Sequence, residues 1–287
     1  MEEYISDNSL YIRSKNNSMI NRKMIGRVLG MLLFIELGMF LLCAGVSAGY
    51  GESDYKYFLY TCIINAVVGG LLLLYGRGAE NKMSRRDGYC VVTLSWVFFT
   101  FFGMLPFYFS GSIDTITNAF FETMSGFTTT GATILDDIES LSHGMLFWRS
   151  LTQWIGGLGI VFFTIAILPI FTTGGVQLFS AESTGVTHDR THPKINVMAK
   201  WLWTIYLVLT VSETVLLMFG GMSLFDAICQ SFATTATGGY STKQNSISYW
   251  NSPYIEYVVA IFMIVSSINF SLFLMCLKGK VGRLFKD

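Results

Sequence analysis

Two short runs rich in threonine and glycine contain the oxygen atoms in this chain that could coordinate a cation. The first return loop is the run TTTGAT at residues 128–133, and the second return loop is the run ATGGYS at residues 236–241. Neither run contains a carboxylate, so both offer threonine hydroxyls and backbone carbonyls, which glycine allows to face a common axis. Such oxygens can replace the hydration shell of a monovalent cation, whereas a divalent cation would favour carboxylates.

Each return loop follows a segment that is too short to cross a membrane. These segments, residues 115–127 and 223–235, are semi-polar and lie between long apolar blocks. We predict a short helix in each, followed by an extended return. Non-helical backbone at membrane depth is tolerated only where it lines protein or a wet cavity. The pattern therefore predicts two re-entrant elements whose carbonyls line an ion path. Their short helices would direct the negative ends of their dipoles toward that path.

The composition places these elements in a membrane protein. The 287 residues are 52% hydrophobic and 13% charged, with a formal net charge of +0. These values argue against a disordered chain and a nucleic-acid binder. Blocks of about 20 apolar residues have the length needed to cross a bilayer. We predict an all-α polytopic fold with six spans, at residues 24–48, 57–75, 90–110, 144–171, 197–219 and 254–277.

The distribution of charge predicts the orientation of the spans. Most of the 19 basic residues precede the first span, follow the last, or lie in the second–third and fourth–fifth connections. By the positive-inside rule both termini are expected in the cytoplasm, so both return loops enter from outside. The outer connection after the first loop carries Asp136, Asp137 and Glu139, which would attract cations.

The predicted third and fourth spans with their short helix and return loop resemble the fifth and sixth spans with theirs. Aligning Gly131 with Gly239 places Glu122 on Gln230 and Thr133 on Ser241. We therefore predict three units: an N-terminal segment with a two-helix unit (1–88), a first pore repeat (89–196) and a second pore repeat (197–287). Repeats of this kind place an ion path at their interface.

Three acids and one arginine lie in or beside apolar segments. Glu36 and Glu213 fall inside spans, where a carboxylate costs about 2.5–3.5 kcal/mol unless it faces protein or water. Each is either a pore-side or coupling acid, or a carboxylate hydrogen-bonded between helices, and we favour the second reading. Glu122 would brace the first return loop or add negative potential near it. Arg149 would extend its head group to the membrane surface, or pair with Glu122 or the outer acids.

Catalytic sites are not expected. The histidines, His143, His188 and His192, all lie outside the predicted spans, so a membrane enzyme with a buried histidine is disfavoured. His188 and His192 have the spacing of a metal pair, but Pro193 follows them directly and makes a helical pair of ligands doubtful.

Four segments together resemble the membrane subunit of the Trk potassium-uptake family, within the Trk/Ktr/HKT superfamily. They are FETMSGFTTTGAT at 121–133, QWIGGLG at 153–159, AESTG at 181–185 and ATGGYS at 236–241. The resemblance covers essentially the whole chain and implies a fold of four span–pore-helix–span repeats around one pore. Only two repeats are present here, so the sequence resembles the N-terminal half of such a subunit and a lone chain is not expected to conduct.

The resemblance also implies ligands and partners. The bound ion would be K⁺, held by backbone carbonyls or threonine hydroxyls at Thr129, Thr130, Gly131, Thr237, Gly238 and Gly239, with Glu122 and Glu213 as candidate supporting residues. The implied partners are the lipid bilayer of the bacterial inner membrane, a second copy in a homodimer, a cytosolic nucleotide-binding regulatory subunit of the TrkA type, and the missing C-terminal repeats.

Two modes of transport remain open at this point. The first is potassium uptake through a pore, driven by the membrane potential. The second is a secondary transporter that moves Na⁺ or H⁺ with K⁺ and uses Glu36 or Glu213 for coupling.

Overall fold

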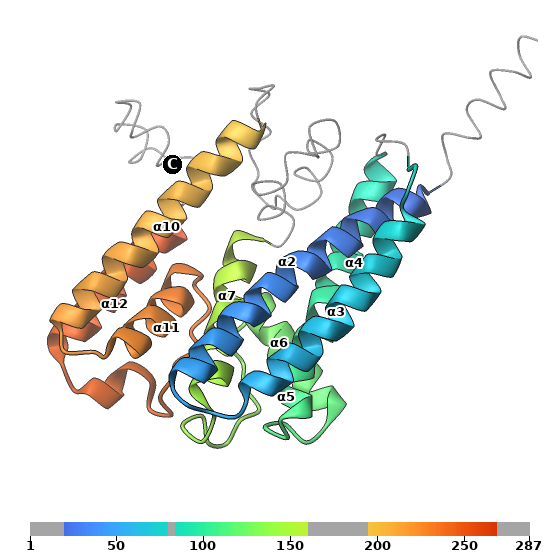
Figure 1. The fold of residues 1–287 in the computed structure, drawn as a ribbon. Coiled ribbons are helices and arrows are strands. Elements are labelled where there is room, and N and C mark those ends of the chain that lie inside the picture. Colours follow the sequence, from blue (N-terminus) through green and yellow to red (C-terminus); the bar gives the residue numbers. More distant parts are fainter. Residues whose placement is uncertain (1–19, 80–83, 160–194, 269–287) are drawn as a thin grey trace, which may run out of the picture.

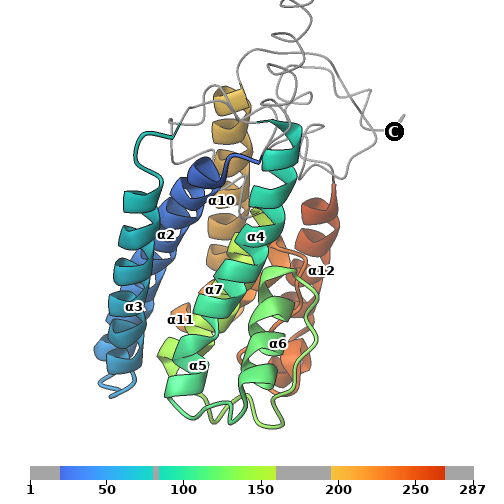
Figure 2. The ribbon, with the colours of Figure 1, turned by 90° about the vertical axis from the view of Figure 1, so that its right-hand side faces the viewer.

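The computed structural model describes residues 20–79, 84–159 and 195–268, and within these ranges the regular structure is helical. Figures 1 and 2 show long helices standing roughly side by side, with the short helices α6 and α11 among them. In chain order the helices are α2 (Arg22–Gly49), α3 (Tyr55–Tyr75), α4 (Arg85–Gly103), α5 (Leu105–Phe109), α6 (Ile116–Phe127), α7 (His143–Leu158), α10 (Ile195–Phe219), α11 (Leu224–Thr235), the 3₁₀ helix η2 (Ser246–Trp250) and α12 (Pro253–Ser267).

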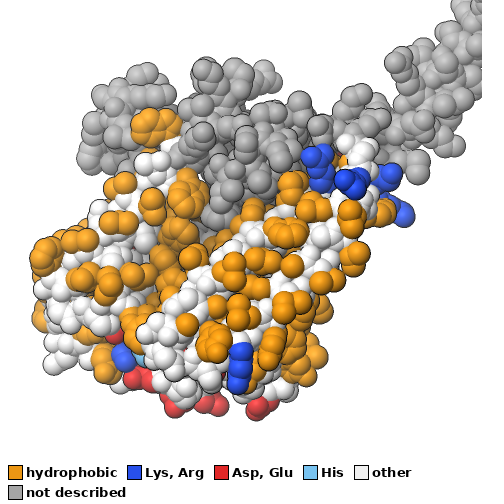
Figure 3. Space-filling model, in the orientation of Figure 1, with side chains coloured by type: hydrophobic (Ala, Val, Ile, Leu, Met, Phe, Trp, Pro, Cys, Tyr) orange, Lys and Arg blue, Asp and Glu red, His pale blue; other side chains and the backbone are white. Residues whose placement is uncertain are grey.

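Within the described residues, four segments are long and apolar enough to cross a membrane: Arg22–Gly49, Tyr55–Tyr75, Arg86–Phe109 and Trp201–Phe219. Their outer faces carry exposed apolar side chains such as Leu42, Ile63 and Leu71, each about 60% exposed. Figure 3 shows apolar side chains over much of the visible face of the described helices. A soluble surface rarely carries such a patch, so this surface faces lipid. Parts of the predicted fourth and sixth spans, beyond residues 159 and 268, lie outside the described ranges.

The two N-terminal spans pack closely as a helical hairpin. A Cβ atom added to Gly30 would stand 2.8 Å from the Gly69 carbonyl oxygen, and one added to Gly76 would stand 2.6 Å from Arg27 Cβ. Small residues allow helix backbones to approach in this way in membranes. The predicted two-helix unit is therefore present as α2 and α3.

The third span differs from its prediction at its start and in its middle. Ser84 and Asp87 form a capping box, so the helix begins at Arg85 rather than near residue 90. Asp87 also accepts a hydrogen bond from the Asn21 backbone (2.8 Å), which ties the start of α4 to the start of α2. The helix then breaks at Met104, and α5 continues with Pro106 in its first turn.

The two short helices have matching bounds and matching caps. Thr115 accepts from the Asn118 N–H (3.2 Å) at the start of α6, and Ser223 accepts from the Asp226 N–H (3.1 Å) at the start of α11. A hydroxyl at the N-cap satisfies one of the orphan N–H groups of a helix start. Both predicted short helices are thus confirmed, to within one residue at each start.

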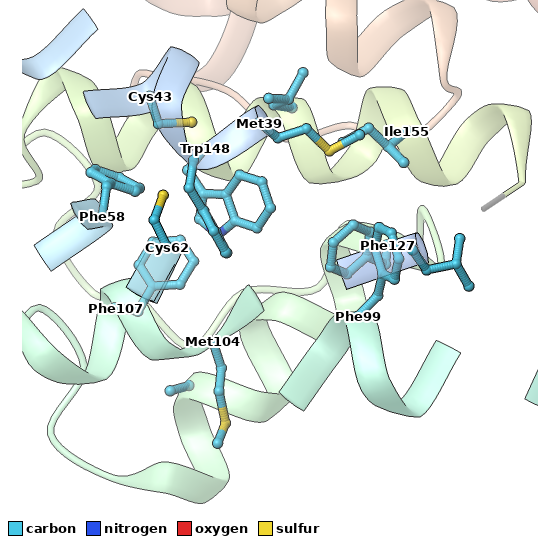
Figure 4. Packing of buried hydrophobic residues seen from close by; sticks show 14 of the residues in the cluster. Met39, Cys43, Phe58, Cys62, Phe99, Met104, Phe107, Phe127, Trp148 and Ile155 are labelled. Carbon is cyan, nitrogen blue, oxygen red and sulfur yellow. The ribbon is translucent and has the colours of Figure 1, made fainter. Parts of the chain in front are cut away.

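Trp148 on α7 is a fully buried residue of the apolar core and lies close to the start of the first return loop. Its ring centroid lies 4.6 Å from that of Phe40 and 5.9 Å from that of Phe127. Its indole N–H donates to the Gly103 carbonyl (2.9 Å), at the point where α4 ends. Figure 4 shows Trp148 among side chains from several helices. This packing fixes α7 against the end of α6, from which the first return loop starts.

Candidate functional site

The two return loops leave their helices with the same backbone pattern. The Thr130 N–H donates to the Ser125 carbonyl (2.9 Å), and the Gly238 N–H donates to the Ala233 carbonyl (2.8 Å). Thr129 and Thr237, the preceding residues, have φ values of 53° and 55°. Both helix ends thus form a Schellman motif, with the left-handed residue at C′. The motif is common among helices, but here it falls at equivalent positions when Gly131 is aligned with Gly239.

Positive φ recurs two residues further along each loop. Gly131 has φ 75° and Gly239 has φ 84°, so left-handed residues alternate with residues of ordinary φ. For non-glycine residues such as Thr129 and Thr237, the left-handed region costs about 1–2 kcal/mol. Strain of this kind persists only where the surroundings impose it, and it concentrates at functional sites.

The two loops meet although they lie far apart in the sequence. A Cβ atom added to Gly131 would overlap the carbonyl oxygen of Gly238. Glycine is therefore needed at residue 131 both for its φ angle and for the close approach of the second loop. This contact brings the two candidate ligand sets, residues 129–131 and 237–239, to one place.

Helix α7 packs closely against the C-terminal ends of both short helices, α6 and α11. A Cβ on Gly156 would overlap the carbonyl of Phe127, the last residue of α6. One on Gly157 would stand 2.8 Å from Ala236, where α11 gives way to the second loop. Both glycines therefore allow close backbone contacts, and α7 packs against the ends of both helix–return-loop units.

A buried ion pair braces the first loop. Arg149 Nε lies 2.8 Å from Glu122 Oε1, and both side chains are almost fully buried. The Glu122 carboxylate also accepts from the Thr133 hydroxyl (2.9 Å) and the Ile134 N–H (3.0 Å). Of the roles predicted for Glu122 and Arg149, the structure shows the bracing contact and the pairing between them.

The same arginine reaches the second loop. Its Nη1 donates to the Ser241 carbonyl (2.9 Å), and its guanidinium lies 3.6 Å from the ring centroid of Tyr240. The Tyr240 hydroxyl donates to the Glu122 carbonyl (2.8 Å), with the Ala132 carbonyl 3.2 Å away. Charge-assisted hydrogen bonds and cation–π contacts of this kind are strong when water is excluded. The two loops are thus held by one shared network.

A second buried side chain on α7, Gln153, touches the second loop. Its Oε1 accepts from the Tyr240 N–H (3.0 Å), and a Cβ on Gly238 would stand 2.7 Å from its Nε2. The sequence alone does not predict this contact. The signal in the sequence is an amide residue inside a largely apolar segment, because a buried amide needs hydrogen-bond partners.

The acids inside the spans bond to helix residues, and among the described residues neither bonds to a return loop. Glu36 accepts from the Asn65 side chain (3.0 Å) between α2 and α3. Glu213 accepts from the Thr235 hydroxyl (3.4 Å) at the end of α11. Both carboxyl groups are fully buried, in agreement with the favoured reading of hydrogen bonds between helices. His188, His192 and the AESTG segment lie outside the described residues.

In the ranges that the structure describes, no three His, Cys, Asp or Glu side chains gather as a metal site. Contacts also continue beyond the loops, where the Ile138 N–H donates to Gln244 Oε1 (3.0 Å) and Lys243 lies 3.4 Å from Glu139.

The fold and the loops define a class: a helical membrane protein in which two helix–return-loop units meet at their glycines. The chain belongs to the TrkH family, described as cation transport proteins, and the family model matches residues 55–287.

Several relatives support this assignment. The chain is 42% identical over 258 residues to the Trk system potassium uptake protein TrkH of Escherichia coli K12, covering 89% of this chain and 53% of that protein. It is 37% identical to TrkH of Halomonas elongata, covering 87% of this chain and 52% of that protein. The crystal structure of the potassium transporter TrkH from Vibrio parahaemolyticus matches with a TM-score of 0.77 and 34% identity, covering 91% of this chain and 53% of that one. The chain thus spans about half the length of these relatives.

Proposed function

We propose that this chain supplies two quarters of a potassium-selective filter in a pore that carries K⁺ into the cell. The observation that carries the proposal is the contact between Gly131 and the Gly238 carbonyl, made by two loops with matching left-handed residues. The ligands would be the carbonyls or hydroxyls of Thr129, Thr130, Gly131, Thr237, Gly238 and Gly239. The relatives named as potassium uptake proteins support K⁺ as the transported ion.

The mechanism needs no covalent step. Carbonyl oxygens that replace the hydration shell let the ion enter, and the absence of carboxylates in both loops lets it leave. An inside-negative potential supplies about 2.3 kcal/mol per charge per 100 mV. Glu122 would support the first loop through its buried hydrogen bonds, and Glu213 would support the end of α11 through Thr235.

The proposal includes an orientation in the bacterial inner membrane, with both termini in the cytoplasm. Figure 3 supports it, because Lys and Arg gather mainly at one end of the visible face, and Asp and Glu gather at the other end, where fewer Lys or Arg side chains are seen. Under the positive-inside rule the basic end is cytoplasmic, and the return loops open to the outside.

The proposal also divides the chain into three units and assigns it partners. Residues 1–88 form the N-terminal unit, 89–196 the first pore repeat and 197–287 the second. Two further repeats would complete the ring, in keeping with relatives of about twice the matched length. A homodimer and a cytosolic nucleotide-binding subunit of the TrkA type complete the assembly, on the resemblance to the Trk family.

Coupling to Na⁺ or H⁺ through Glu36 or Glu213 is not favoured. Each carboxylate already accepts a side-chain hydrogen bond from a neighbouring helix, and neither bonds to a residue of the described return loops.

The test is rubidium uptake by the full-length gene product in cells that lack other potassium uptake systems. We compare the wild type with Gly131→Ser and Gly239→Ser, each of which places a side chain at a positive φ. Gly111→Ser is the matched control, since Gly111 has φ 70° in the turn between α5 and α6, with open space around it. Loss of uptake in the two loop variants alone supports the proposal. A wild type that takes up no rubidium, or loop variants equal to the control, would overturn it.

A further inference from the structure

The Gln153 side chain occupies the junction of the two return loops. It is fully buried on α7, and its Oε1 accepts from the Tyr240 N–H in the second loop (3.0 Å). A Cβ on Gly238 would meet Oε1 at 2.5 Å and Nε2 at 2.7 Å. The amide therefore fills the space that glycine leaves open at residue 238.

The same amide also approaches the first loop. A Cβ on Gly131 would stand 3.9 Å from Gln153 Nε2, at van der Waals distance. Because the Tyr240 N–H is a donor, it must face the amide oxygen, and this fixes Nε2 on the opposite side of the amide. Both polar atoms of the amide thus lie against Gly238 of the second loop, and the nitrogen also lies near Gly131 of the first loop.

The nitrogen is the unusual part of this arrangement. Gln153 Nε2 is buried and has no hydrogen-bond partner among the described residues. Buried donors are normally paired, so an unpaired one in a native site calls for a reason. A polar amide here costs free energy that a leucine of similar size would not, which argues that its position between the loops serves something other than stability.

We propose that Gln153 is a positioning residue that fixes the spacing of the two return loops and thereby the preference of the pore for K⁺ over Na⁺. This inference rests on the proposed filter. Selectivity by a carbonyl ring depends on cavity size or on the number and field of its oxygens, and both change if two quarters of the ring shift. Gln153 holds Tyr240 directly and lies against Gly238, so its loss frees the second loop beside the candidate ligands.

The experiment measures rubidium and sodium uptake by the full-length gene product in proteoliposomes, together with its amount in the membrane. Gln153→Leu removes both polar atoms at similar volume. Gln153→Asn keeps the amide but shortens its reach by one methylene. Ser150→Ala is the matched control: Ser150 is also buried on α7, and its hydroxyl donates to Leu146 of the same helix.

We expect the ratio of rubidium to sodium uptake to fall about tenfold in Gln153→Leu, a change of 1.4 kcal/mol in relative barrier, and to fall in Gln153→Asn as well. Ser150→Ala keeps the wild-type ratio. A purely structural role would lower the amount of protein and both fluxes together, with the ratio unchanged. Either Gln153 variant present in the membrane with a wild-type ratio overturns the inference, so Gln153→Asn decides if Gln153→Leu does not accumulate. Failure of the filter proposal is distinguishable, because the wild type itself would then show no preference for rubidium.

Discussion

Arg149 and Glu122 form a buried ion pair, 2.8 Å between Nε and Oε1, that connects α7 to the first short helix. Because Arg149 also donates to the Ser241 carbonyl, the pair joins the first return loop to the second. A buried pair rarely adds much net stability, but breaking it leaves an uncompensated charge. The main role of the pair is therefore to fix the position of the two return loops relative to each other.

Arg149→Met is expected to destabilise the protein by about 3–5 kcal/mol, because it leaves the Glu122 carboxylate buried without its partner. The double variant Arg149→Met/Glu122→Gln should recover part of this loss. Lys243→Met is the control, since Lys243 and Glu139 form a partly exposed pair worth about 0–1 kcal/mol. Thermal unfolding in detergent measures all three. Equal losses for Arg149→Met and Lys243→Met would show that the buried pair has no special role.

Gly156→Ala should prevent assembly of the site, because the new methyl group would overlap the Phe127 carbonyl. Backbone atoms cannot yield as a flexible side chain can, so α7 must move away from α6. Gly70→Ala on α3 meets open space and should be neutral or stabilising by up to about 1 kcal/mol, as expected for alanine in a helix. The amount of each variant in the membrane and its rubidium uptake are measured together. Normal uptake by Gly156→Ala would contradict the close packing of Gly156 against Phe127.

Glu36→Gln and Glu213→Gln should each leave rubidium uptake within about twofold of the wild type, because an amide of the same shape keeps the acceptor. Their partners, Asn65 and Thr235, can still donate to it. Uptake is measured with and without external Na⁺ and at two external pH values. A large loss of uptake, or a loss of its dependence on Na⁺ or pH in either variant, would instead favour a transporter that moves Na⁺ or H⁺ together with K⁺.

Glu52 lies in the turn between α2 and α3. We expect its carboxyl group to make the stability of the protein depend on pH. Partial burial raises its pKa, but hydrogen bonds from the His143 N–H (2.8 Å), the His143 ring and the Gly144 N–H outweigh this effect and leave the pKa lowered. A lowered pKa contributes stability above the unfolded value of about 4.3, and this contribution is lost as the pH falls through the folded value.

The Tm difference between wild type and Glu52→Gln should therefore be about 2–4 °C at neutral pH and should close below about pH 4. Glu139→Gln, at the partly exposed pair with Lys243, serves as the control. A gap that stays constant across this pH range would show that the Glu52 carboxylate does not contribute through its charge.

The sequence predicts the individual elements well because each depends on local features. The short helices at 115–127 and 223–235 are predicted from semi-polar segments that lie between long apolar blocks and are too short to cross a membrane, and they agree with α6 and α11. The start of α4 was missed because the Ser84–Asp87 capping box outweighs the hydropathy boundary. The break at Met104 was missed because hydropathy does not register the end of a helix inside an apolar block.

The contacts between elements could not be predicted in the same way. The alignment of Gly131 with Gly239 indicates equivalent positions, but it does not say that Gly131 touches the Gly238 carbonyl. The pairing of Arg149 was one of several alternatives, and only the fold selects Glu122 and adds the Ser241 carbonyl. Gln153 stands in the segment QWIGGLG, but that segment does not indicate which loop the amide contacts, because the contact depends on where α7 places it.

The most direct test of the central claim is the position of a heavy alkali cation in crystals of the full-length protein soaked with rubidium. The account predicts an anomalous peak bounded by backbone oxygens of both return loops, at residues 129–131 and 237–239. A rubidium peak remote from these loops, with none between them, would contradict it.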